Sequence, residues 1–205
     1  MAEFYFNKKL CYVTNMKQNL ILGLDLDGTL ADHTEIKLTL AKEFGFDLPA
    51  HQTASEIIKD IIPEAHYKEF QRKLYAELSH LAKKMDFVEE ALKELENLGW
   101  NFILVSRRKA DGHDSARQWL NAHLNGLIPE NKIFFVEEDP DKNLVCRNEN
   151  VTAFVDDQTG VLQYLDPSIL RILIDPFGNW DSNPPQDFKL VKSWRDIPPL
   201  LSNLE

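Results

Sequence analysis

Short apolar segments recur along this chain, and each is bounded by polar turn residues. Apolar runs of this kind are typical of strands that are buried in a parallel sheet. The predicted strands are residues 21–24, 101–105, 133–136, 151–155 and 169–174.

Amphipathic segments lie between these predicted strands, with apolar residues three and four positions apart. The predicted helices are residues 88–98, 114–124, 142–147 and 160–165. Asp86 and Glu89 predict a capping box at the start of the first of them, and Gly99 predicts its end. Strands that alternate with helices predict an α/β fold, a Rossmann-like doubly wound parallel sheet.

The segment after the first predicted strand has a different character, because its patterns are helical and none of them strongly predicts a strand. Residues 36–44 carry one apolar stripe, and Gly45 closes it. Pro63 is well placed at a first helical position. A long amphipathic helix is predicted to follow, with its apolar stripe running from Tyr67 to Met85.

These patterns predict one core that carries one insertion. Residues 1–31 and 86–205 are predicted to form the Rossmann-like core, and residues 32–85 a small helical cap inserted after the first strand. The amino-terminal arm, residues 4–13, is predicted to be a short strand or hairpin. The tail from Asp175 onward, which is rich in Pro and Trp, is predicted to be irregular with a final helix.

Composition and charge narrow the class of protein. With 205 residues, 43% of them hydrophobic, the chain suits a single globular domain with a modest insert. A formal net charge of -10 argues against a nucleic-acid polymer or an anionic membrane as the partner. No apolar run approaches the length of a membrane span, and the start of the chain does not resemble a signal peptide. Cys11 and Cys146 show no metal-site or disulfide spacing, so we expect a cytoplasmic protein.

Acidic and polar residues stand where three of the predicted strands end. Asp25 and Asp27 follow the first strand, Ser106 the second, and Asp156 with Asp157 the fourth. In an open parallel sheet, ligands bind beyond the carboxyl ends of the strands. We therefore expect these segments, which are far apart along the chain, to meet at one edge of the sheet.

The residues at these strand ends resemble the motifs of the haloacid dehalogenase superfamily. The motifs are DLDGT at residues 25–29, ILVS at residues 103–106, a lysine before the fourth strand, and FVDD at residues 154–157. The resemblance spans residues 20–175. An Asp two residues after the nucleophile marks the phosphatases and phosphotransferases of this superfamily, so Asp27 argues against carbon–halogen cleavage.

The resemblance implies a role for each acid. Asp25 would be the nucleophile that forms an aspartyl-phosphate, and Asp27 would protonate the leaving alcohol and later activate water. Carboxylates that converge on a phosphate repel it, by roughly 4 kcal/mol for a like-charge pair about 4 Å apart at an effective dielectric near 20. Mg²⁺ would offset that repulsion. Its expected ligands are Asp25, the main-chain carbonyl of Asp27, and one or both of Asp156 and Asp157.

The remaining predicted site residues carry donors or positive charge. Ser106 would donate a hydrogen bond to a phosphoryl oxygen, and Lys142 would balance the charge of the nucleophile, with Lys132 as the alternative lysine. Arg107 and Arg108 would either bind an anionic group of the substrate or form ion pairs. His33 is expected in a solvent-facing loop.

These inferences favour a Mg²⁺-dependent phosphohydrolase that acts on a small phosphorylated metabolite. The adjacent acids Asp156 and Asp157 and the core layout resemble the nucleotidases of the superfamily, which makes a nucleoside monophosphate a candidate substrate. A phosphotransferase or mutase and a non-catalytic binding protein are the alternatives. No membrane or nucleic-acid partner is expected, and a homodimer is left open because no feature of the sequence supports one.

Overall fold

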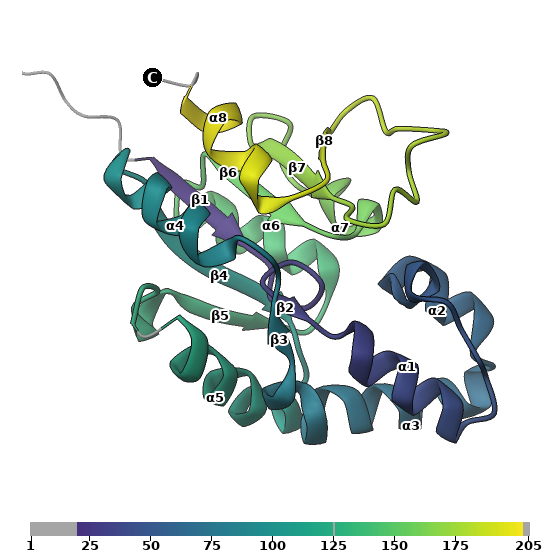
Figure 1. The fold of residues 1–205 in the computed structure, drawn as a ribbon. Helices are drawn as coiled ribbons and strands as arrows, with labels where there is room; N and C mark the ends of the chain where they lie inside the picture. Colours follow the sequence, from purple (N-terminus) through teal and green to yellow (C-terminus); the bar gives the residue numbers. More distant parts are fainter. Residues whose placement is uncertain (1–19, 125, 203–205) are drawn as a thin grey trace, which may run out of the picture.

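A six-stranded parallel sheet forms the centre of the molecule in the computed structural model, which describes residues 20–124 and 126–202 (Figure 1). The strands lie in the order β5-β4-β1-β6-β7-β8. Their bounds are β1 Ile21–Leu24, β4 Asn101–Arg107, β5 Ile133–Val136, β6 Ala153–Asp156, β7 Leu170–Ile174 and β8 Lys189–Val191. The predicted Rossmann-like α/β fold is confirmed, and the strand predicted at each apolar run is present.

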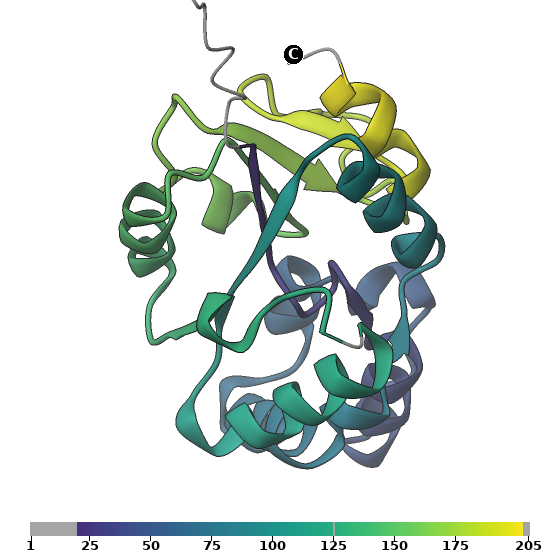
Figure 2. The same cartoon turned by 90° about the vertical axis from the view of Figure 1, so that its left-hand side faces the viewer.

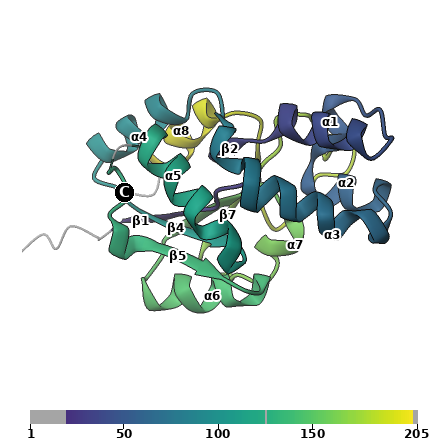
Figure 3. The ribbon, with the colours of Figure 1, turned by 90° about the horizontal axis from the view of Figure 1, so that it is seen from below.

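Helices cover both faces of this sheet. Figures 2 and 3 show α4 (Val88–Asn97), α5 (His113–His123) and α8 (Ile197–Leu201) on one side, and α6 (Asp139–Asn148) and α7 (Thr159–Leu162) on the other. Successive strand residues face opposite sides, which produces two apolar clusters. In the central strand, for example, Leu22 and Leu24 belong to the first cluster and Ile21 to the second.

The insert, residues 32–85, packs around an apolar cluster of its own beyond the ends of the strands (Figure 1). It contains α1 (Thr34–Glu43), α2 (Ser55–Ile61), α3 (Glu64–Arg72) and a π-helical segment (Lys73–Leu78). The buried apolar residues of this cluster are Leu40, Ala41, Ile58, Ile62, Phe70 and Leu74. Pro63 stands one position before α3, as its N-cap.

Two features of the insert differ from the sequence prediction. Short strands, β2 (Ala31–Asp32) and β3 (Lys83–Lys84), pair antiparallel where the insert joins the core, so the segment is not purely helical. The long helix predicted to reach Met85 passes into the π-helical segment after Arg72 and ends near Leu81, whose side chain is 62% exposed. The chain has to return to the core there, and the Trp119 indole donates to the Ala82 carbonyl at 2.7 Å.

Two further predictions about the core were wrong or incomplete. The capping box at Asp86 and Glu89 is absent, because Phe87 occupies the N-cap of α4 with a left-handed φ of 66° and no side-chain cap hydrogen bond. The tail holds the predicted final helix α8, but it also adds strand β8 to the sheet.

The amino-terminal arm and Cys11 lie outside the described residues, while Cys146 is a buried free thiol. Among the described residues, no helix has both the length and the apolar character that a membrane span needs.

Candidate active site

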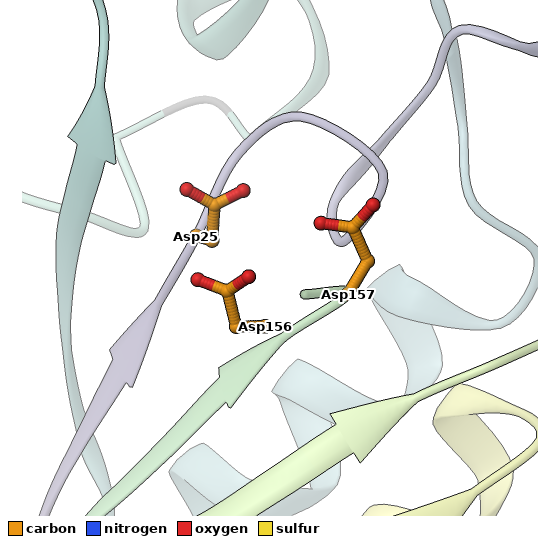
Figure 4. A group of neighbouring side chains, drawn as sticks. All are labelled: Asp25, Asp156 and Asp157. Carbon is orange, nitrogen blue, oxygen red and sulfur yellow. The ribbon is translucent and has the colours of Figure 1, made fainter. Parts of the chain in front are cut away.

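Three carboxylates meet at the ends of two neighbouring strands. Strands β1 and β6 pair in parallel with Leu24 opposite Val155, and therefore Asp25 and Asp156 leave the sheet side by side. Carboxylate oxygens of Asp25, Asp156 and Asp157 all lie within 4.8 Å of one another (Figure 4). The predicted convergence of residues 25 and 156–157 is thus present in the structure.

Gly28 allows the loop after β1 to approach this cluster. Its φ of +89° is a backbone conformation that residues other than glycine rarely adopt. Its N–H donates to the Ala31 carbonyl at 2.9 Å. A Cβ at this position would collide with the Asp157 carboxylate. The glycine of the DLDGT motif therefore keeps the loop close to the acids.

Lys142 lies between two of the acids. Its side chain is 1% exposed, and its Nζ is 2.7 Å from Asp25 Oδ1 and 2.8 Å from Asp156 Oδ2. The alternative lysine, Lys132, pairs instead with Glu149 at 2.6 Å and lines a different part of the surface. Of the two lysines considered, the structure brings only Lys142 to the acids.

Asp27 has different partners from the other acids. Its carboxylate forms an ion pair with the buried guanidinium of Arg108, which also donates to Ser79 Oγ at 2.6 Å. His33 Nε2 lies 3.4 Å from Asp27 Oδ1. The prediction of a solvent-facing His33 was wrong, because the residue is 2% exposed and its ring is enclosed beside Asp27 at the start of α1.

Burial and neighbouring charge shift the pKa values of these acids in opposite directions. Burial raises the pKa of Asp25 and that of Asp156, despite the nearby Lys142. Burial, and then the charge of Asp25, raises the pKa of Asp157 to about 7. Burial also acts on Asp27, but Arg108 and His33 outweigh it and lower its pKa.

The three-acid cluster fits a hard divalent cation. Its donors are all carboxylate oxygens, which Mg²⁺ prefers. Burial raises the pKa values of the three acids, and a bound cation would favour their ionised forms. Asp157 Oδ1 is buried and has no hydrogen-bond partner among the described residues. The Asp27 carboxylate is not part of this cluster, which is consistent with the prediction that only its main-chain carbonyl would bind metal.

Ser106 and Arg107 lie at the end of β4, the strand on the other side of β1. Ser106 is 1% exposed, and within the described chain its Oγ has no hydrogen-bond partner. Arg107 is exposed and pairs with Asp139 at 2.8 Å. Thr29 Oγ1 is also buried without a hydrogen-bond partner in the described residues.

A cavity of about 580 Å³ opens over these groups. From the core it is lined by Asp25, Asp27, Ser106, Arg107 and Lys142, and from the insert by Lys68, Gln71, Arg72 and Tyr75. A second cavity of about 560 Å³ is lined by Gly28 and Asp157 together with residues of the insert and tail, including Lys37, Glu56 and Trp180. Space large enough for a small molecule therefore lies next to both Asp25 and Asp157.

Several residues close to the acids were not predicted from the sequence. Lys37, Ser55 and Glu56 come from the insert. Ser55 and Glu56 contact core residues that are far away along the chain, and Lys37 donates to Ser55. Tyr75 approaches Arg108, with 5.3 Å between its ring centroid and Cζ. No motif marks them, since their positions depend on how the insert folds against the core.

No protein-family model matches this chain, and no curated protein matches its sequence. Solved structures do resemble it. A haloacid dehalogenase-superfamily hydrolase from Ehrlichia chaffeensis is 17% identical, with a TM-score of 0.59 over 92% of this chain and 98% of that one. A haloacid dehalogenase-like protein from Agrobacterium tumefaciens is 13% identical, with a TM-score of 0.66 over 91% of this chain and 99% of that one.

A third structure, a hydrolase of the same superfamily from Deinococcus radiodurans that was solved with bound phosphate and sodium, is 14% identical. It has a TM-score of 0.60, over 90% of this chain and 95% of that one. These likenesses extend over nearly the whole of each chain. Together with the parallel sheet and the acids at the ends of β1 and β6, they show that the chain has the haloacid dehalogenase-like fold that its motifs predicted.

Proposed function

We propose that this protein is a Mg²⁺-dependent phosphohydrolase that removes phosphate from a small phosphorylated metabolite through an aspartyl-phosphate. The observation that carries the proposal is the position of the Asp25 carboxylate, which lines a cavity beside Lys142 and two further acids. The phosphate bound to the Deinococcus radiodurans protein of the same fold supports this choice of ligand.

In the first step, an oxygen of the Asp25 carboxylate attacks phosphorus in line with the leaving alcohol. The Asp25–phosphorus bond forms as the bond to the alcohol oxygen breaks, and Asp27 gives that oxygen its proton. Lys142 holds the nucleophile in place, and the free Ser106 Oγ donates to a phosphoryl oxygen. In the second step, Asp27 takes a proton from water, and the water oxygen attacks phosphorus and releases phosphate from Asp25.

The environment of Asp27 suits this change of role. Arg108 keeps its pKa low in the free protein, which favours the carboxylate that the second step needs. An anionic substrate next to Asp27 raises its pKa and favours the protonated form that the first step needs. Mg²⁺ held by Asp25, Asp156 or Asp157 and the Asp27 carbonyl would offset the charge of the phosphoryl group.

The insert is proposed to act as a cap over the site. Its residues Lys68, Gln71 and Tyr75 line the cavity opposite Asp25 and would contact the leaving group. A cap of this kind excludes water and limits the substrate to a small molecule, for which a nucleoside monophosphate is a candidate. A cytoplasmic location agrees with the free thiol of Cys146.

A panel of phosphorylated metabolites, incubated with Mg²⁺ and no other acceptor, tests the proposal. We expect phosphate release, and Asp25→Asn should reduce it by roughly 10³-fold or more because the nucleophile is lost. Lys142→Met should lower the rate strongly, whereas Lys132→Met, the matched control away from the acids, should not.

Three outcomes would contradict this assignment. Hydrolysis by Asp25→Asn at the parental rate would exclude Asp25 as the nucleophile. Phosphate transfer that needs an added acceptor would favour a phosphotransferase, and no turnover of any kind would favour a binding protein.

A further inference from the structure

Lys37 is a second buried lysine close to the acid cluster, and the proposed reaction does not use it. It lies on α1 of the insert and is 4% exposed. Its Nζ donates to the Thr53 carbonyl at 2.9 Å and to Ser55 Oγ at 3.2 Å. A lysine is seldom buried without a charged partner nearby, so its position needs an explanation.

Ser55 connects Lys37 to the acids of the core. Ser55 Oγ, which accepts from Lys37, donates to Asp157 Oδ2 at 3.4 Å, so a single hydroxyl links the ammonium to the cluster. Burial lowers the pKa of Lys37, and the carboxylates of Asp157 and Asp27 oppose that shift more than other groups do. The insert thus places a positive charge against the side of the cluster away from Lys142.

Lys37 changes the net charge of the site. Four carboxylates face two basic side chains of the core, Lys142 and Arg108. When the four carboxylates are ionised around a divalent cation, these charges sum to zero, and Lys37 raises the sum to one positive charge. The added positive charge of Lys37 strengthens the attraction of a phosphoryl dianion.

We propose that Lys37 is a charge-balancing residue supplied by the insert, which strengthens the binding of the phosphoryl anion and weakens the binding of the metal ion. This inference rests on the proposed function. The same positive charge acts on both ligands, but with opposite signs, since one is an anion and the other a cation.

Calorimetric titration tests the inference without reference to turnover. Mg²⁺ is titrated into the parent protein and into Lys37→Gln, and inorganic phosphate is then titrated into each at saturating Mg²⁺. We expect Lys37→Gln to bind Mg²⁺ about tenfold more tightly and phosphate about tenfold more weakly. A role in supporting the fold of the insert alone would not tighten metal binding.

Two variants serve as controls. Lys37→Arg keeps the charge and should leave both affinities near the parental values. Lys42→Gln removes the same charge from an exposed position on the same helix, where the lysine pairs with Asp47 at 3.6 Å, and should change neither affinity. Should Lys37→Gln unfold, Lys37→Met takes its place in the titrations.

The inference is overturned if the uncharged variant shifts both affinities in the same direction, or shifts neither. It is also overturned if Lys37→Arg behaves as Lys37→Gln does. The proposed function fails in a separate way, through a parent protein that binds neither ligand and releases no phosphate.

Discussion

Arg107 and Arg108 are neighbours in sequence, but the structure gives them different roles. Arg107 is exposed and pairs with the half-buried Asp139, while Arg108 is 3% exposed and pairs with Asp27. Ion pairs near the surface contribute little to stability, because solvent screens them. Removal of one partner from a buried pair leaves an uncompensated charge, which is far more costly.

Substitution of each arginine by methionine measures this difference. We expect Arg108→Met to lower the free energy of unfolding by about 3–5 kcal/mol, because the Asp27 carboxylate would stay buried without its partner. Arg107→Met should change it by less than about 1 kcal/mol. Urea unfolding of both variants at pH 7 provides the comparison, and equal losses would show that the Arg108 pair is not the stabilising feature we describe.

His33 predicts a dependence of stability on pH. Burial lowers its pKa from 6.5 to about 4 in the folded protein. The unfolded chain therefore binds the proton more tightly, and the contribution of His33 is fully present above pH 6.5 and is lost as the pH falls toward 4. At pH 5 this lowers the free energy of unfolding by about 2 kcal/mol.

Comparison with His33→Gln isolates that contribution from those of the acids. Between pH 7 and pH 5, the free energy of unfolding measured with urea should fall by about 2 kcal/mol more in the parent than in the variant. Identical pH profiles for the two proteins would mean that the folded and unfolded states bind the His33 proton equally.

The residues of the site differ in how far the sequence could predict them. Asp25, Asp156 and Asp157 follow apolar strands, and their convergence is a consequence of the parallel sheet, so a local pattern was sufficient. His33 and Lys37 carry no such local signal, because their burial depends on contacts that form only when the insert folds against the core.

At the scale of elements, helix α2 of the insert is docked on the amino-terminal end of α7 in the core. The Glu56 carboxylate accepts from Gly160 N at 2.8 Å and from Thr159 Oγ1 at 2.9 Å. Ser55, the preceding residue, reaches Asp157 in the same loop. These contacts hold the insert against the loop that follows β6 and carries Asp157.

Glu56→Ala should loosen this contact and leave the core folded. Hydrogen bonds to a charged group contribute about 1.5–3 kcal/mol, so amide exchange in residues 158–162 and in α2 should become roughly tenfold faster or more. Hydrogen-exchange mass spectrometry provides the measurement. Glu64→Ala, at an exposed position at the start of α3, is the control and should leave exchange in both segments unchanged.

The strands that were not predicted from the sequence are short, and their apolar residues do not recur at a regular spacing. Strands β2 and β3 have two residues each, and β3 consists of Lys83 and Lys84. Strand β8 has three residues, of which only Val191 is buried. Their pairing depends on tertiary contacts such as the hydrogen bond from Met85 N to the Leu30 carbonyl at 2.9 Å. The longer apolar strands were predicted because burial on both faces of the sheet is visible in the sequence.

At the scale of the whole molecule, the acid cluster opposes folding unless a cation is bound. In the folded protein the pKa of Asp157 is about 7, against an ordinary value of 3.8. The folded state therefore binds the proton more tightly than the unfolded chain, and its stability falls as the pH rises from about 4 to 7. Above pH 7 the full cost of the ionised carboxylate is present, and a bound metal ion would offset it.

Asp157→Asn should consequently affect global stability in opposite directions with and without Mg²⁺. At pH 8 and without metal, the variant should be more stable than the parent by about 2 kcal/mol, because it removes one charge from the cluster and retains an oxygen that can accept from Ser55. With Mg²⁺ at about 100 times its dissociation constant, the parent should gain about 2.7 kcal/mol and the variant much less. Thermal unfolding of both proteins with and without Mg²⁺ gives the four values required. If the variant is the less stable protein under both conditions, Asp157 acts as a structural hydrogen-bond acceptor, and the argument that a cation compensates this cluster is wrong.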